Sequence, residues 1–337
     1  MNDEQIDQRG SSSGMVGVGL KAPYDSEIPQ PALRRWRIAD FVALLKPRPM
    51  AVVLLTAIAG LLAAPVDPGL ETRLMAILAI AAGGGGAAAL NMWFERDIDA
   101  RMARTARRPI PSGRVTANEA LLFALVLIAG AMWLMAAAAG AVAATVLALT
   151  ILFYGVVYTM WLKRATALNV VVGGGLASLL TPLSGWAAAT KGINIEALSL
   201  FAFLVPWTPP HVWSQALVRA SDYRSAGVPM MPVVAGVSRT CWLIFAFTVV
   251  HSMLALWPSL TGATGVLWTT IAAVGGAGLV VLAFRLAVTA DAASTNARAW
   301  RLYRWNSVYV AALLAALVGE RLFGLGIPIS ALSGNAG

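Results

Sequence analysis

The chain has 337 residues, of which 58% are hydrophobic and 12% are charged, and its mean hydropathy is +0.72. Soluble domains carry about 25% charged residues, so this composition excludes an ordinary soluble domain and predicts an integral membrane protein. The net charge of +9 then indicates positive residues on cytoplasmic loops, in preference to a surface for nucleic acid.

Apolar runs recur along the chain, each close to the about 20 residues that a transmembrane helix needs. Residues 1–38 are polar and predict a disordered cytoplasmic tail, residues 39–325 a transmembrane domain, and residues 326–337 a short C-terminal tail. No polar residue separates the third run from the fourth, and the boundary is placed near Gly140. We predict an all-α polytopic membrane protein with about nine helices, at 41–63, 74–95, 118–138, 141–162, 168–189, 197–218, 241–260, 265–288 and 306–324.

Positive residues test this helix count, because cytoplasmic loops are enriched in lysine and arginine. With the N-terminus in the cytoplasm, 22 of the 25 Lys and Arg residues fall on the cytoplasmic side, and only Arg73, Lys191 and Arg321 fall on the other. This split predicts a cytoplasmic N-terminus and a C-terminus on the opposite side of the membrane.

The first polar constellation follows the second predicted helix, in NMWFERDIDARMARTARRP (91–109). Asn91, Glu95 and Asp99 are four residues apart, so on a helix they share one face, whereas Asp97 points elsewhere unless the helix unwinds. Neighbouring carboxylates repel unless a cation joins them, and such oxygen ligands suit Mg²⁺ together with substrate phosphates. A solvated loop explains the charged part equally well, but Asn91 lies in an apolar span, where a polar group is costly.

Basic residues on the same side of the membrane could hold an anionic group with a fork of N–H donors. Several of them are equally well explained as the positive residues of cytoplasmic loops. The candidates are Lys46 at the first helix, Arg104 and Arg108 after the first constellation, and Lys163 and Arg164 between the fourth and fifth helices.

The second polar constellation lies in WTPPHVWSQALVRASDY (207–223). His211, Arg219 and Asp222 fall on one helical stripe, and two adjacent prolines predict a break in the helix just before it. An interrupted helix is tolerated at membrane depth where it lines a cavity. Asp222 would then face the first constellation across a metal and a phosphate, whereas His211 could equally be a hydrogen-bonded core residue.

The first constellation resembles the first aspartate-rich motif of the UbiA-type intramembrane prenyltransferases. In the spacing of Glu95 and the trailing MARTARRP (102–109), it resembles the protohaem IX farnesyltransferases, or haem O synthases. The second constellation, with AGVPMMPVV (226–234), resembles the second motif of that group. Three shorter stretches also match in order, namely LKPRP (45–49), YTMWLKRATALNVVVGG (158–174) and PLSGWAA (182–188). The resemblance covers roughly residues 40 to 324.

This resemblance implies a helix bundle around a cytoplasm-facing cavity. It also implies Mg²⁺-dependent transfer of a farnesyl group from farnesyl diphosphate to the 2-vinyl group of haem b, giving haem O for terminal oxidases. The implied catalytic residues, all but Asp97 also metal ligands, are Asn91, Glu95, Asp97, Asp99 and Asp222. The implied diphosphate-binding residues are Lys46, Arg104, Arg108, Lys163 and Arg164, and the implied haem-binding residues are His211 and Arg219.

One position departs from the wider family, because Arg219 stands where the quinone-precursor branch carries an acid. This leaves open whether one or two Mg²⁺ ions bind, and it favours haem propionates over a neutral ring. The alternatives are a related enzyme that prenylates a quinone or another aromatic precursor, and a secondary transporter with broken helices at mid-membrane.

The resemblance also implies a partner and a location. A haem A synthase-type enzyme could take the product directly. The acids in the first 38 residues are unlike a mitochondrial transit peptide, so the expected location is the bacterial inner membrane.

Overall fold

The computed structural model describes residues 37–324, and helices are the only regular elements among them. The all-α prediction is therefore confirmed. The predicted tails at 1–38 and 326–337 lie outside the described residues, except that Ile38 already begins the first helix. The first elements are α1 (Ile38–Leu44), α2 (Pro47–Ala63), α3 (Leu70–Phe94), α4 (Arg96–Arg101), α5 (Ala117–Ile151), the π-helical η1 (Leu152–Leu162) and α6 (Lys163–Ala165).

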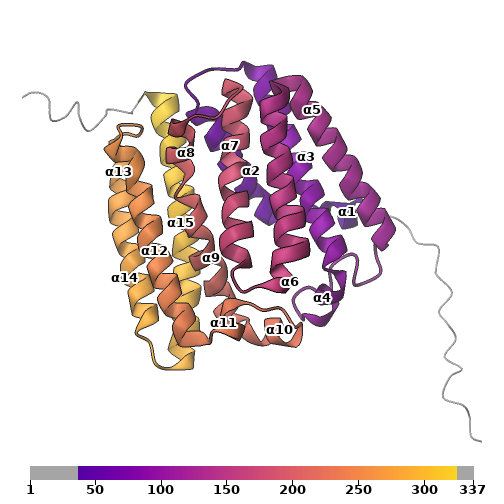
Figure 1. Cartoon of the computed structure of the whole chain (residues 1–337), viewed down its shortest axis with the longest axis vertical. Helices are drawn as coiled ribbons and strands as arrows, with labels where there is room; N and C mark the ends of the chain where they lie inside the picture. The colour runs from indigo at the N-terminus through magenta and orange to yellow at the C-terminus, as the bar shows by residue number, and fades with distance from the viewer. Residues whose placement is uncertain (1–36, 325–337) are drawn as a thin grey trace, which may run out of the picture. The chain divides into compact units, whose positions relative to one another are not determined.

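The second part of the chain continues the bundle, and several of its helices are divided into shorter pieces (Figure 1). Its elements are η2 (Val170–Gly174), α7 (Gly175–Thr190), α8 (Ile195–Phe201), α9 (Leu204–Val218), α10 (Ala220–Ser225), α11 (Met231–Val234), α12 (Val237–Leu260), α13 (Val266–Thr270), η3 (Ile271–Gly275), α14 (Gly276–Ala287) and α15 (Ala292–Phe323).

The chain is a multi-pass membrane protein. Six helical stretches of the described part are long and apolar enough to cross a membrane, or seven if α1 and α2, bent by 53°, form one span. The predicted spans 118–138 and 141–162 both fall in one of these stretches, Ala117–Ala165. The predicted span 197–218 is divided between α8 and the 15-residue α9. All nine predicted runs lie on helices, and the count of nine spans stays a prediction.

The chain reverses direction inside α5. A Cβ atom placed on Gly83 of α3 would lie 3.4 Å from Ala131 Cβ and 3.0 Å from Ile151 Cδ1. In a straight helix, residues about 20 positions apart are separated by about 30 Å, so these two can meet Gly83 only if the chain turns back between them. Gly140 has non-helical dihedral angles there (φ 87°, ψ −177°), and the predicted boundary near this glycine is confirmed.

Glycines allow α2 and α7 to cross at backbone contact. A Cβ atom on Gly60 would lie 1.9 Å from the carbonyl oxygen of Pro182, and one on Gly185 would lie 2.1 Å from that of Ala57. Small residues at such crossings are typical of helix packing in lipid. The close crossing holds α2 and the Lys46 turn that precedes it against the centre of the bundle.

The break predicted at Pro209 and Pro210 is wrong, because α9 runs through both residues. Membrane helices tolerate prolines where surrounding protein packs over the freed carbonyl groups, and both prolines are buried. The helix is interrupted earlier, between α8 and α9, and later at Arg219, whose backbone (φ −116°, ψ 23°) separates α9 from α10.

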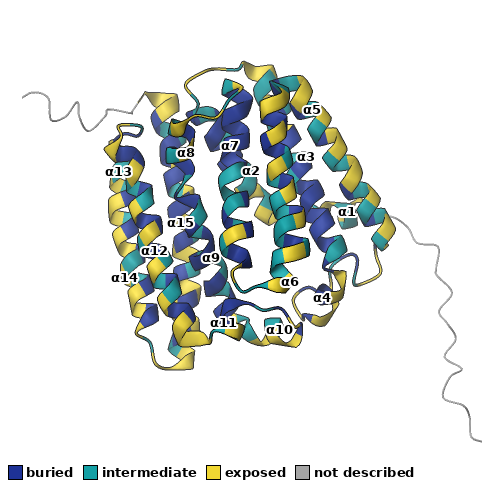
Figure 2. Ribbon diagram, viewed as in Figure 1, coloured by how far each residue is buried: buried dark blue, intermediate teal, exposed yellow. Residues whose placement is uncertain are grey.

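Apolar side chains face both the core and the outside of the bundle. Figure 2 shows exposed residues along the outer helices α5 and α14, and buried residues along α9 and α15. Trp133 is 73% exposed and Val274 is 71% exposed, which suits contact with lipid. The short helices α4, α6, α10 and α11 gather at one end of the bundle (Figure 1), and the polar constellations lie there.

Candidate active site

The first constellation turns the end of α3 into one wall of a cavity. Asn91, Glu95 and Asp99 are each only 2% exposed to solvent, yet all three line a cavity of about 310 Å³. We call this the polar cavity, and its lining residues are Lys46, Pro49, Asn91, Glu95, Ile98, Asp99, Met102, Arg104, Arg108, Tyr154, Tyr158, Lys163, Gln215, Tyr223 and Val228.

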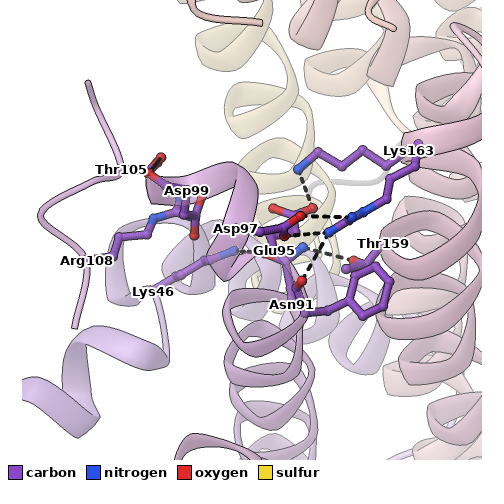
Figure 3. A network of polar contacts seen from close by, with 11 residues as sticks. Lys46, Asn91, Glu95, Asp97, Asp99, Thr105, Arg108, Thr159 and Lys163 are labelled. Carbon is purple, nitrogen blue, oxygen red and sulfur yellow. Dashed lines mark hydrogen bonds and ion pairs between the residues drawn. The ribbon is translucent and has the colours of Figure 1, made fainter. Parts of the chain in front are cut away.

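Each acid of the first constellation has a basic partner, and two of the three partners come from another part of the chain. Lys163 pairs with Glu95, and Arg108 pairs with Asp99 at 2.7 Å. Lys46 donates to the side-chain oxygen of Asn91. Figure 3 shows Lys46 and Lys163 reaching Asn91 and Glu95 from opposite sides. The cavity is thus assembled from α3, from the residues that follow it, and from the segments around Lys46 and Lys163.

Asp97 and Arg164 form a separate pair outside the polar cavity. Arg164 donates to Asp97 at 2.7 Å and to the carbonyl oxygen of Phe94 at 3.2 Å. Both side chains are exposed, and neither lines the cavity. The prediction that Asp97 points away from its three polar neighbours agrees with this position, and Arg164 holds the turn between α3 and α4.

Basic neighbours keep Glu95 and Asp97 ionised. Burial raises the pKa of Glu95, but the positive charges of Lys163 and Lys46 outweigh burial and hold this pKa below its usual value. Burial likewise raises the pKa of Asp97, and the hydrogen bond from Arg164 outweighs it. Both carboxyl groups therefore remain negative at neutral pH.

Positive charge exceeds negative charge in the lining of the polar cavity. The lining contains four basic residues, Lys46, Arg104, Arg108 and Lys163, against the two acids Glu95 and Asp99. Arg104 has no acid partner in the part of the chain that the structure describes, and burial lowers its pKa. A lining in which basic side chains outnumber acidic ones is suited to an anion of high charge.

Lys46 reaches the cavity from a strained turn. It lies between α1 and α2 with a left-handed backbone (φ 51°, ψ 62°), a conformation that costs a non-glycine residue about 1–2 kcal/mol. Such strain persists where the surrounding structure fixes it, and it gathers at functional sites. Here the turn directs the Lys46 ammonium to Asn91.

A larger and mainly apolar cavity adjoins the polar one. It has a volume of about 630 Å³, and its walls come mostly from α2, α7, α9 and α15. We call it the apolar cavity. The two cavities adjoin, because five residues line both, namely Lys46, Pro49, Tyr154, Tyr158 and Gln215.

The second constellation is divided between the two cavities and their surroundings. His211 lines the apolar cavity, and Gln215, one helical turn later, lines both. Arg219 donates to Gln215 at 2.7 Å and lies over the ring of Trp300, 5.9 Å from its centroid. Asp222 lies on α10 and does not line the polar cavity, so the structure does not bring it together with the first constellation.

The residues present suit a divalent cation by their chemistry. Asn91, Glu95 and Asp99 offer amide and carboxylate oxygens to one cavity, and Mg²⁺ prefers such oxygens in company with substrate phosphates. Among residues 37–324, no group of three or more His, Cys, Asp or Glu side chains is placed to hold a metal without other ligands. A metal here would take its further ligands from the substrate or from water.

Several uncharged residues in or beside the two cavities were not among the residues selected from the sequence. Thr159 accepts a hydrogen bond from Asn91 at 3.0 Å and is fully buried. Tyr154 and Tyr158 stack with ring centroids 6.0 Å apart at the junction of the two cavities. Hydroxyl groups are common in apolar spans, so the spacing of these residues did not mark them as part of a site. To place them, the sequence would have had to reveal that η1 is π-helical, with hydrogen bonds to the fifth residue.

Comparison with known proteins gives matches over most of the chain. Residues 52–326 match the model of the UbiA prenyltransferase family. A protoheme IX farnesyltransferase of Methylobacterium radiotolerans is 43% identical over 307 residues, covering 90% of this chain and 96% of that protein. A protein of the same name from Parvibaculum lavamentivorans is 45% identical over 287 residues, covering 85% and 90%.

Solved structures show the same fold at low sequence identity. A digeranylgeranylglyceryl phosphate synthase superposes with a TM-score of 0.69 at 16% identity, over 85% of this chain and 99% of that one. A UbiA homologue from Archaeoglobus fulgidus, bound to DMAPP and Mg²⁺, superposes with a TM-score of 0.64 at 16% identity, over 81% and 99%.

Proposed function

The chain belongs to the UbiA prenyltransferase family, and from this premise we propose that it transfers the farnesyl group of farnesyl diphosphate to the 2-vinyl group of haem b, giving haem O. Relatives that are 41–45% identical to this chain over the aligned residues are named protoheme IX farnesyltransferases. This favours haem b over a quinone precursor as the acceptor. The chain is thus a prenyltransferase enzyme of the membrane.

The observation that carries the proposal is that a positively charged cavity adjoins an apolar one. The polar cavity, with four basic and two acidic side chains, suits a diphosphate. The apolar cavity, which shares five lining residues with it, suits a farnesyl chain and a porphyrin. The bond to be broken would lie at the junction, beside Tyr154 and Tyr158.

Mg²⁺ is proposed as the cofactor, with Asn91, Glu95 and Asp99 as its ligands. The homologue from Archaeoglobus fulgidus binds Mg²⁺ together with DMAPP, and the oxygen donors here suit the same ion. When bound, the metal would neutralise the charge that develops on the leaving diphosphate. Asp222 keeps its predicted role only if α10 moves toward the cavity.

The basic residues of the polar cavity would bind the diphosphate. Lys46, Arg104, Arg108 and Lys163 all line that cavity, and each can donate to phosphate oxygens. Arg164 does not line the cavity, and we propose that it instead positions α4 through Asp97.

The atoms of the reaction balance with water as a third reactant. The bond between C1 of the farnesyl group and the diphosphate oxygen breaks, and diphosphate leaves with the electron pair. C1 then bonds to the terminal carbon of the vinyl group, and the hydroxyl of a water molecule adds to the neighbouring carbon while its proton is released. The apolar cavity limits access of other water to the allylic carbon.

We also propose a location and a partner. The distribution of lysine and arginine supports a cytoplasmic N-terminus, which places the polar cavity on the cytoplasmic side of a bacterial inner membrane. Haem O is poorly soluble in water, which favours direct transfer to a haem A synthase-type enzyme.

The test is a product assay with purified protein in detergent, supplied with haem b, farnesyl diphosphate and Mg²⁺. We expect a haem product heavier by one farnesyl group and one hydroxyl group, absent with a chelator and in Glu95→Gln. Formation of a prenylated aromatic acid in place of a haem product would contradict the proposed acceptor. Absence of transfer to either acceptor would contradict the enzyme assignment.

A further inference from the structure

We propose that Nε2 of His211 binds the iron of haem b as an axial ligand while haem occupies the apolar cavity. This inference rests on the proposed function and adds to it the point at which the acceptor is anchored. Three observations support it. His211 lies between two aromatic side chains that line the cavity, Ser307 lies beside its Nδ1, and no other histidine lines the cavity among the described residues.

The ring of His211 is held in one orientation by two aromatic neighbours. Its centroid lies 4.5 Å from that of Trp207, one turn earlier on α9, and 4.7 Å from that of Tyr303 on α15. All three residues line the apolar cavity. The ring therefore has little freedom to turn, and a ligand in the cavity meets it at a fixed edge.

Ser307 lies beside one nitrogen of the His211 ring. Its hydroxyl is 2.9 Å from the carbonyl oxygen of Tyr303, which can only accept, and 3.3 Å from Nδ1 of His211. With the hydroxyl hydrogen on the Tyr303 carbonyl, Ser307 accepts from Nδ1–H, and the lone pair of the neutral ring is then on Nε2.

This is the arrangement that histidine ligands of metals adopt. Such histidines donate the N–H of one ring nitrogen to an oxygen acceptor, and the other nitrogen binds the metal. Here Ser307 is the acceptor, and no described residue occupies Nε2. Nε2 is therefore free to bind a Lewis acid. The proposed acceptor, haem b, contains such a Lewis acid in its iron.

The chain offers no second imidazole for this role. It contains two histidines, and the other, His251, is fully buried outside the apolar cavity with Nδ1 2.8 Å from the carbonyl oxygen of Phe203. The single cysteine, Cys241, does not line the cavity either.

Ligation at His211 would place the macrocycle beside the reacting bond. Gln215 follows His211 by one helical turn, about 6 Å along the axis, and lines both cavities. Iron fixed at His211 therefore holds the edge of the porphyrin near the junction where the allylic carbon is released. An anchored ring would also present one vinyl group in preference to the other.

The test uses the full chain in detergent, loaded with haem b in the absence of farnesyl diphosphate. Uniform ¹⁵N labelling of histidine, followed by pulsed EPR of the ferric complex, should show hyperfine coupling from a histidine nitrogen bound to iron. This readout needs no variant, and absence of the coupling would overturn the proposal.

Variants identify the residue. His211→Ala should lose the absorption spectrum of nitrogen-ligated haem, weaken haem binding by about tenfold or more, and regain the spectrum on addition of imidazole. Gln215→Leu, which alters the same cavity wall, should keep the spectrum. A wild-type spectrum in His211→Ala would also overturn the proposal, whatever its activity.

The outcomes for ligation and for the proposed function remain distinguishable. Haem O formation by the wild type, together with an unchanged spectrum in His211→Ala, would reject ligation and keep the function. A histidine-ligated spectrum without any haem O would keep ligation and reject the function.

Discussion

The side-chain amide of Asn91 donates to the hydroxyl of Thr159 across 3.0 Å and so joins α3 to η1; of these two residues, Asn91 lines the polar cavity. Thr159 in turn donates its only hydroxyl hydrogen to the carbonyl oxygen of Tyr154 at 2.7 Å, five residues earlier in the π-helical segment. Thr159 can therefore only accept from Asn91. This fixes the amide nitrogen on the Thr159 side and leaves the amide oxygen facing Lys46 and the cavity.

Removal of the Thr159 hydroxyl should weaken metal binding. In Thr159→Val the amide of Asn91 is free to turn its nitrogen toward the cavity, and we expect about tenfold weaker Mg²⁺ binding. Calorimetry of Mg²⁺ with a non-reacting farnesyl thiodiphosphate measures this effect without turnover. Thr159→Ser keeps the hydroxyl and should bind as the wild type does; equal weakening in both variants would contradict the orienting role.

Two arginines that both pair with aspartates should differ in their effect on substrate. Arg108 lines the polar cavity, whereas Arg164 does not, and exposed ion pairs such as Arg164–Asp97 contribute about 0–1 kcal/mol. We expect Arg108→Gln to weaken binding of the thiodiphosphate about tenfold, which is about 1.4 kcal/mol. Arg164→Gln should stay within about threefold. Equal losses would place Arg164 in the diphosphate site.

Gly173 leaves room for Tyr158, and a methyl group there should displace the tyrosine. A Cβ atom on Gly173 would lie 2.5 Å from Tyr158 Cβ and 2.9 Å from its Cα. We expect Gly173→Ala to lower kcat at least about tenfold, because Tyr158 lines both cavities, and to destabilise the fold by about 1–3 kcal/mol. Gly130→Ala is the matched control, since no described atom beyond its own turns of helix lies within 4 Å of its Cβ position. Unchanged kcat in Gly173→Ala would show that Tyr158 tolerates the shift.

The crossing of α2 and α7 should tolerate no side chain at Gly185. The nearest atoms to a Cβ atom there are backbone atoms of α2, the first at 2.1 Å, so the helices would have to separate. We expect Gly185→Ala to lower the thermal midpoint in detergent by several degrees, for a loss of about 1–3 kcal/mol or more. Gly278→Ala on α14, where no described atom lies within 4 Å, should leave the midpoint unchanged. A midpoint equal to that of the wild type in Gly185→Ala would mean that the crossing is looser than described.

Residue spacing predicted the parts of the site that carry charge. Asn91, Glu95 and Asp99 were expected on one face from their four-residue spacing, and they line one cavity, because α3 stays regular to Phe94 and α4 resumes at once. Membrane burial makes charged residues rare, so each one in an apolar chain is informative. The basic residues opposite them were selected for the same reason.

The parts that depend on backbone irregularity were not predictable. The stripe from His211 to Asp222 assumed one continuous helix, but Arg219 departs from helical geometry, so Tyr223 lines the cavity where Asp222 was expected. Similarly, Tyr158 and Lys163 are five residues apart, a spacing that an ordinary α-helix does not place on one face, yet both line the cavity through π-helical η1.

The pairing of every cavity acid with a base has a consequence for the order in which reactants arrive. A cation that comes alone must compete with the Lys163 ammonium for Glu95 and with the Arg108 guanidinium for Asp99, and the displaced bases would have no partner. A cation that arrives with a diphosphate brings new acceptors for both bases. The enzyme should therefore remain metal-free in a cell rich in Mg²⁺ until the prenyl donor enters, and donor and metal should bind as one unit.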